Sequence, residues 1–70
     1  MSEFAASFRR SKRGNLYREF EGTTLTVFSR PDGRFSWCIA EADNSQHYGS
    51  NYETEEDAMD GLEFMVEQLF

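Results

Sequence analysis

The chain has 70 residues, 39% of them hydrophobic, and a formal net charge of −6 at pH 7, which leaves room for a single domain. With one cysteine, Cys38, and one histidine, His47, it can form neither an internal disulfide nor a closed four-ligand zinc site. No run approaches the roughly 18 apolar residues of a membrane-spanning helix, and a lone cysteine suits a reducing compartment. We therefore expect a cytoplasmic protein without a metal or other cofactor.

The charges are distributed unevenly along the chain. All seven Lys and Arg residues lie within residues 1–34, together with four acids, a local balance of +3. Residues 35–70 hold nine acids and no Lys or Arg, a balance of −9. Such segregation bears on surfaces and partners rather than on the fold.

Residues 1–14 (MSEFAASFRRSKRG) predict a flexible basic tail, which precedes a single ββββα domain over residues 15–70. The segment is small, polar and basic, and it ends at a glycine. Its cations, which include Arg9 and Arg10, could contact nucleic acid or a membrane surface. A solvated leader is the simpler interpretation.

Four short β-segments follow the tail. Residues 16–20 predict a weak first strand, and residues 23–30, dense in Thr, Leu, Val and Phe, predict a clear second one. The sequence Arg30-Pro31-Asp32-Gly33 is typical of a tight hairpin turn, because proline presets φ and glycine accepts left-handed geometry. Residues 34–42 predict the return strand, and a turn at residues 43–45 leads to a polar fourth strand over 46–52. Tight turns between consecutive strands make a meander.

The hairpin is expected to pair residues near Val27 with residues near Trp37. Phe35, Trp37 and Ile39 alternate onto one face of the return strand. We expect Trp37 to anchor the core beside Leu25 or Val27, facing a helix.

That helix is predicted to begin at Thr54, which is an N-cap with Asp57 as its capping-box partner. Acids fill the first turn, where the helix dipole favours negative charge. An apolar stripe at helical spacing is expected to pack on the sheet; it comprises Ala58, Leu62, Met65, Val66 and Leu69. The sequence therefore predicts an α+β fold, an antiparallel meander of three to four strands with one C-terminal α-helix packed on one face.

The far side of this helix carries Phe64 among acids that include Asp60 and Glu67. A lone exposed apolar side chain is ordinary, and so is one covered by the N-terminal tail. An aromatic ringed by acids is also the arrangement expected of a hot spot for a basic partner. The chain's own segment 9–13 is one candidate for that partner.

Aromatic residues outnumber the places available in one helix–sheet layer. Alternation puts Phe28 on the face opposite Val27, and Tyr17, Tyr48 and Tyr52 add to the surplus. An uncovered aromatic sheet face is an interface or an aggregation liability. We expect a two-fold dimer that buries this face or extends the sheet through an edge strand.

A pattern of strand, turn, aromatic strand, turn, strand and helix runs from Leu25 to Met65 in the pieces LTVF, SRPDG, RFSWCI, ADNS, YGSNY and ETEEDAMDGLEFM. In this order and in residue class the chain resembles the YegP-like family of small bacterial proteins. It departs from that family at Ser45, where glycine is expected, and in its more acidic helix. The resemblance implies a ββ(β)α unit that pairs with a second copy, in tandem or as a dimer, and it implies no activity.

A three-stranded sheet followed by a helix is also similar to plant AP2-type and integrase-arm DNA-binding domains, which read the major groove with Arg and Trp on the exposed sheet face. The arginines available here are Arg18, and Arg30 and Arg34 at a turn. The mid-strand positions that need cations in such domains are held by Thr26, Phe28, Ser36 and Cys38. DNA binding is therefore the weaker alternative.

Catalytic chemistry has little support in the sequence. Cys38 lies mid-strand without a neighbouring cation or helix N-terminus to activate it, which indicates an inert packed thiol. His47 lacks a nucleophile or metal partner and is expected at the surface or a sheet edge. The chain shows no phosphate-binding glycine loop, nucleophile elbow or calcium loop. We expect no enzymatic activity.

Two functions stay open. The first is a protein-interaction module acting as a homodimer, with a possible further basic partner on the acidic helix. The surface residues proposed for it are Phe28, Tyr48, Phe64, Asp60, Glu67, Arg9 and Arg10. The alternative is a nucleic-acid-related protein that binds DNA through its basic N-terminal third or imitates DNA with its acidic C-terminal third.

Overall fold

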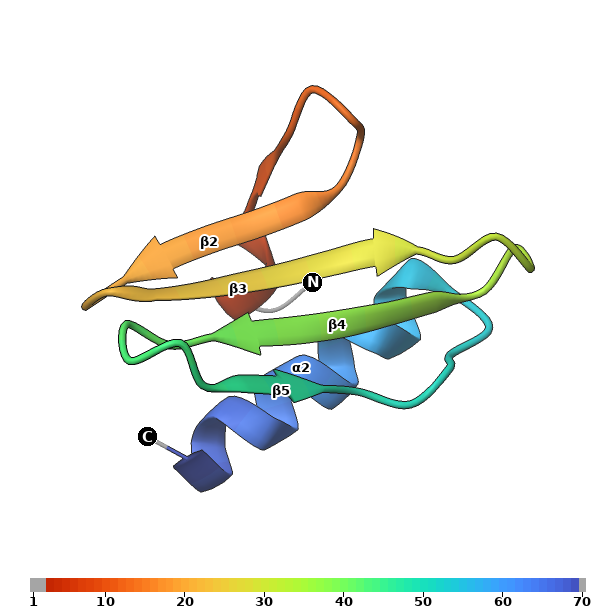
Figure 1. The fold of residues 1–70 in the computed structure, drawn as a ribbon. Coiled ribbons are helices and arrows are strands. Elements are labelled where there is room, and N and C mark those ends of the chain that lie inside the picture. Colours follow the sequence, from red (N-terminus) through yellow and green to blue (C-terminus); the bar gives the residue numbers. More distant parts are fainter. Residues whose placement is uncertain (1–2, 70) are drawn as a thin grey trace.

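A computed structural model describes residues 3–69, with Phe20 described by its backbone only. The elements are α1 (Glu3–Ala6), β1 (Arg9–Arg10), β2 (Leu16–Phe20), β3 (Thr23–Ser29), β4 (Phe35–Ala40), β5 (Gln46–Tyr48) and α2 (Glu55–Leu69). The strands form one antiparallel sheet in the order β1-β2-β3-β4-β5, and α2 packs against β3 and β4 on one face (Figure 1). The predicted α+β meander with a C-terminal helix is confirmed.

The N-terminal segment differs from the predicted flexible tail. Within residues 1–14, α1 forms a short helical turn and β1 pairs with β2, placing Arg9 opposite Tyr17. Phe4 and Phe8, whose ring centroids lie 5.2 Å apart, pack against the core. These two aromatic residues supply the apolar surface that holds the segment in place. The small, polar and basic residues around them are instead typical of a flexible tail. The sheet therefore has one strand more than the four predicted.

Three of the four hairpin turns share one geometry, in segments 11–15, 30–34 and 41–45. In each, the N–H of the first residue donates to the C=O of the fifth (2.7, 2.7 and 2.8 Å), and the N–H of the fourth donates to the C=O of the first (2.9, 3.0 and 3.0 Å). The fourth residue has a φ of 87° at Gly14, 83° at Gly33 and 72° at Asn44. This is a three-residue hairpin loop, which needs Gly or Asn at its left-handed position.

Aspartate side chains close two of these turns. Asp32 Oδ1 accepts the N–H of Arg34 at 2.9 Å, and Asp43 Oδ1 accepts the N–H of Ser45 at 2.9 Å. The predicted hairpin around Pro31-Asp32-Gly33 is confirmed, with Val27 directly opposite Trp37.

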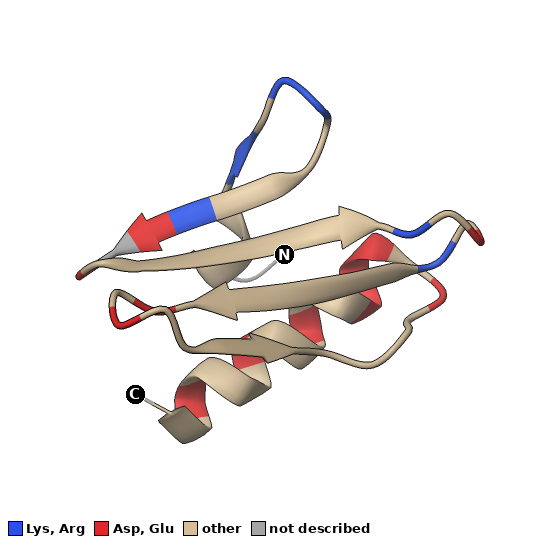
Figure 2. Ribbon diagram, in the orientation of Figure 1, with Lys and Arg blue, Asp and Glu red and all other residues tan. Residues whose placement is uncertain are grey.

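The turns carry charge of opposite sign at the two ends of the sheet. Because the strands alternate in direction, the β1–β2 and β3–β4 turns lie at one end, and the β2–β3 and β4–β5 turns lie at the other. The turn residues at the first end include Lys12, Arg13, Arg30, Arg34 and a single acid, Asp32; those at the second end include Glu21, Glu41 and Asp43 (Figure 2).

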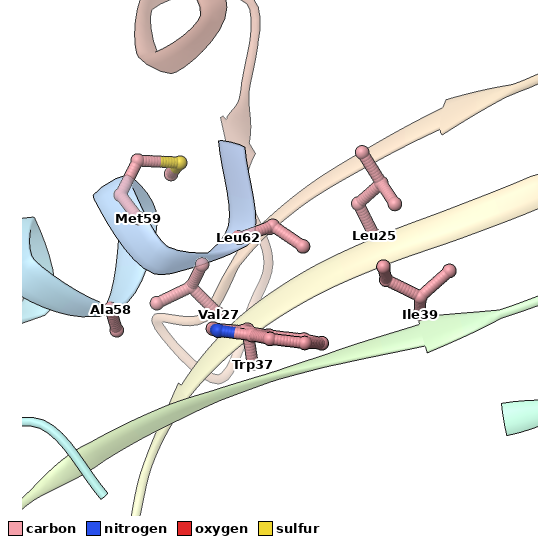
Figure 3. Packing of buried hydrophobic residues seen from close by; sticks show 7 residues of the cluster. All are labelled: Leu25, Val27, Trp37, Ile39, Ala58, Met59 and Leu62. Atoms are coloured by element: carbon pink, nitrogen blue, oxygen red, sulfur yellow. The ribbon is translucent and has the colours of Figure 1, made fainter. Parts of the chain in front are cut away.

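The core lies between α2 and the two central strands (Figure 3). Its buried members are Leu25, Val27, Trp37 and Ile39 from the sheet and Ala58, Met59 and Leu62 from α2. Trp37 is 3% exposed, and its indole N–H donates to Tyr52 Oη at 3.3 Å. The prediction that Trp37 anchors the core under the helix is confirmed.

The helix begins as expected but buries a slightly different stripe. Thr54 Oγ1 accepts the N–H of Asp57 at 3.0 Å, so Thr54 is the N-cap. Met59, which the predicted stripe does not include, is 5% exposed, whereas Leu69, which it does include, is 43% exposed. The core contacts of α2 therefore concentrate in its first half.

Candidate interaction surface

The sheet has one face without a helix among the described residues. Val27, Trp37 and Ile39 point toward α2, and α1 lies on the same side, since Ala5 and Met59 line one shallow hollow between the two helices. The opposite face, here called the open face, carries the residues that alternate with these. Cross-strand pairing aligns one row on it across all five strands: Arg9, Tyr17, Thr26, Cys38 and Tyr48.

Arg9 and Tyr48, at the two ends of this row, are exposed, and the three residues between them are half-buried. Tyr48 is 63% exposed, and its hydroxyl donates to Gln46 Oε1 on the same strand. Phe28 lies on the open face as predicted, opposite Ser36, and is half-buried. Ser36 is 1% exposed, and its hydroxyl donates to the C=O of Gly49 at 3.1 Å. The open face is thus an aromatic and small-polar surface.

Tyr52, counted with the surplus aromatics in the sequence, lies on the other face. Gly49 N–H donates to Trp37 C=O, and Phe35 N–H donates to Tyr52 C=O. Phe35 and Trp37 are two positions apart on β4, whereas Gly49 and Tyr52 are three positions apart on the facing segment. The extra residue on the facing segment is a β-bulge. The extra residue reverses the alternation, so Tyr52 reaches the helix side and packs against the core.

Arg9 and Arg10, predicted to act together, point to opposite faces of the sheet. Arg9 lies on the open face beside Tyr17, where both line a shallow hollow of about 410 Å³. Arg10 lies on the helix side and forms an ion pair with Glu55, its Nη2 3.0 Å from Oε1 and its Nη1 3.3 Å from Oε2. The hydrogen bond and the charge of Glu55 raise the pKa of Arg10. Strand alternation therefore prevents the two arginines from forming one patch.

On α2, Phe64, Asp60 and Glu67 are all exposed, Phe64 to 63%. The ion pair that joins the basic segment to α2 is at Glu55, nine residues before Phe64, which is about 13.5 Å along a helix axis. Within one chain, the basic segment thus binds the first turn of α2 and not the surroundings of Phe64, contrary to the interpretation in which Arg9–Arg13 covers this ring.

Cys38 and His47 are the two side chains that the sequence singled out as candidates for chemistry. Burial raises the pKa of the Cys38 thiol, against a smaller opposite effect of the Tyr48 hydroxyl, so the nucleophilic thiolate is disfavoured. His47 Nε2 lies 3.3 Å from Glu41 Oε2 at the β5 edge. Within residues 3–69, no cluster of three or more His, Cys, Asp or Glu side chains has the geometry to hold a metal ion. No helix in the same range has the length and apolarity to cross a membrane.

The arginines available for groove reading lie on the helix side of the sheet or at one end of the open face. Trp37 is buried on the helix side, and Arg18 lies opposite Leu25, which is also on that side. Arg30 and Arg34 flank the hairpin loop at one end of the open face. The middle of that face carries no arginine among the described strand residues.

Sequence reasoning missed the row that crosses the sheet, because it treated the aromatic residues one strand at a time. The signal was present in the hairpin loop. A loop of three residues after Arg30 places Thr26 opposite Cys38, as observed. The recruitment of Arg9 to this row had no comparable local signal.

Comparison of the chain with models of protein families, with curated proteins and with solved structures gives no match. The resemblance to the YegP-like family stays a prediction.

Proposed function

We propose that the chain is a non-enzymatic protein-interaction module that acts as a homodimer. The observation that carries the proposal is the charge of the hairpin turns, which hold four cations and one acid at one end of the sheet and three acids at the other (Figure 2). When two copies are related by a two-fold axis that reverses the strand direction, the basic end of each lies along the acidic end of the other. The layout is thus complementary to itself.

The distribution of uncharged surface supports the same partner. An isologous interface places a residue near its own copy around the axis, so a patch of one charge repels itself there. The basic β1 edge and the acidic outer side of α2 are such patches. The middle of the open face and the β5 edge are mostly uncharged, and Tyr48 is exposed where they meet. The lone reduced Cys38 suits a cytoplasmic location for this dimer.

Sedimentation equilibrium across micromolar to millimolar concentrations tests the proposal. We expect a mass of twice 8.2 kDa in the upper part of this range at physiological ionic strength. An 8.2 kDa species throughout would contradict it. A salt-titrated electrophoretic shift with duplex DNA tests the alternative function, because phosphate contacts weaken steeply as salt rises.

A further inference from the structure

Within residues 3–69, the edge of the sheet at β5 has backbone groups without partners. Glu41 N–H donates to Ser45 C=O, and Gly49 N–H donates to Trp37 C=O. The backbone N–H and C=O groups of residues 45, 47 and 49 therefore point toward β4. The N–H and C=O groups of Gln46 and Tyr48 point the other way, because antiparallel strands alternate the direction of their backbone groups. The backbone of this edge is thus prepared to accept another strand.

The two edges of the sheet differ in the charges that protect them. The β1 edge carries Arg9 and Arg10 and continues into Lys12 and Arg13, and charged side chains are the usual protection of an edge against pairing. The β5 edge runs from Gln46 to Asn51 without Asp, Glu, Lys, Arg or Pro. Its protection is limited to the short length of β5, three residues.

The side of α2 that lies at the same edge is also uncharged. A Cβ on Gly61 would overlap the Tyr52 hydroxyl. Gly61 therefore marks the side of α2 that faces the β5 edge of the sheet. At 100° per residue, the residues C-terminal to Gly61 within 60° of it are Phe64, Met65 and Gln68. The acids of this half, Glu63 and Glu67, lie outside that range. In Figure 1 the C-terminal half of α2 is drawn beyond β5, on the side away from β4.

Among the described residues, the three large hydrophobic side chains with the highest exposure belong to this region or border it. They are Tyr48 at 63%, Phe64 at 63% and Leu69 at 43%. A strand edge of three residues alone buries too little area for a stable dimer, which needs about 800 Å² per partner. The adjoining side of α2 supplies the apolar area that the strand lacks.

We infer that two copies join through β5 into one ten-stranded antiparallel sheet, with a two-fold axis at His47 and the C-terminal halves of the two α2 helices packed together beneath it. This inference rests on the proposed homodimer and assigns its interface. In this register, Gln46 of one copy lies opposite Tyr48 of the other, and the outward groups of both residues form four backbone hydrogen bonds across the axis.

The register also defines how the two His47 residues meet. Because the backbone groups of His47 face β4, this residue and its own copy form a non-hydrogen-bonded pair, with Cα atoms about 4.5 Å apart. That separation lies within the range that a disulfide bridges, about 4.4–6.8 Å. A disulfide between two cysteines at position 47 would therefore show directly that the two-fold axis lies there.

The first experiment combines Cys38→Ser with His47→Cys and applies a mild oxidant to the native protein. We expect most of the chain to run as a covalent dimer on a non-reducing denaturing gel. The matched control, Cys38→Ser with Glu19→Cys, has its thiol exposed on the open face of β2, far from the axis, and should stay monomeric on the gel.

The second experiment replaces Gln46 by proline, which removes one outward N–H and no hydrogen bond to β4. Sedimentation should show a dissociation constant at least ten-fold higher, with an unchanged circular dichroism spectrum. Phe64→Ala should weaken the dimer in the same direction. If the parent chain is a dimer but His47→Cys does not cross-link and Gln46→Pro associates normally, this interface is wrong and the homodimer stands. If the parent chain is a monomer, both are wrong.

Discussion

Two close approaches at single residues decide how the helix lies on the sheet. Gly61 leaves room for the Tyr52 hydroxyl, which in turn accepts the indole N–H of Trp37. Gly49 leaves the same kind of room for the indole ring. Neither glycine has a positive φ among the backbone angles of the described residues, so packing and not backbone conformation requires them.

Gly61→Ala should therefore destabilise the protein, although the same change in an exposed helix interior stabilises by about 1 kcal/mol. The added methyl group displaces Tyr52 and overpacks the core, at a cost of about 1–3 kcal/mol. Urea denaturation measures the difference. In a Tyr52→Ala background the overlap is gone, and the substitution should become stabilising. A stabilising effect in both backgrounds would contradict the close approach.

Trp37→Ala should leave most of the chain unfolded. Truncating a buried aromatic side chain costs about 3–5 kcal/mol, and a domain of this size has a total stability of a few kcal/mol. Thermal unfolding followed by circular dichroism should lose its cooperative transition. Trp37→Phe keeps a ring against Val27 and should retain the transition at a lower temperature. Cooperative melting of Trp37→Ala near the parent's temperature would refute the placement of Trp37.

At the scale of elements, the three similar hairpin loops separate backbone conformation from packing. A Cβ on Gly33 would have no atom within 4 Å, yet the φ of this residue is 83°. Gly33→Ala should thus cost about 1–2 kcal/mol from backbone strain alone. Asn44→Gly, at the equivalent position of the β4–β5 turn, keeps a residue that accepts positive φ and should change the free energy of unfolding by only a few tenths of a kcal/mol. If Asn44→Gly destabilised the protein as much as Gly33→Ala does, the two loops would differ in geometry.

The β4–β5 turn should also respond to pH. The hydrogen bonds from Ser45 lower the pKa of Asp43, so its ionised carboxylate stabilises the folded state. This contribution is fully present above the ordinary pKa of Asp, about 3.9, and is lost as the pH falls through the lower pKa of the folded state. The stability difference between the parent and Asp43→Ala should shrink across that interval in acid titrations. A constant difference from pH 6 to pH 2 would exclude this role of the charge.

At the scale of the whole molecule, the charges at the two ends of the sheet should govern assembly. Arg30→Glu combined with Arg34→Glu makes both ends acidic, so self-association should weaken, and added salt should reduce the difference from the parent because it screens the repulsion. Sedimentation at two ionic strengths measures this. A matched control adds Glu56→Lys and Glu63→Lys on α2 to this double variant, which returns the net charge to −6 while the turns at both ends stay acidic, so association should stay weak. Recovery of association in this variant would point to net charge instead of layout.

What the sequence determined by itself is local. The turn at Pro31-Asp32-Gly33, the N-cap at Thr54, the alternation of Val27 with Phe28 and the exposure of Phe64 all depend on residues a few positions apart. Their physical causes are φ preferences, capping hydrogen bonds and side-chain periodicity. From these, the order of β2 to α2 and the two faces of the sheet could be predicted.

What only the tertiary structure decided involves contacts distant in sequence. The docking of Phe4 and Phe8 on the core turned a basic segment into a fifth strand, and that strand separated Arg9 from Arg10. A bulge moved Tyr52 to the helix side, where its hydroxyl meets Trp37. In each case the free energy comes from apolar surface and hydrogen bonds that exist only after the sheet and α2 have packed, so no local pattern carries it.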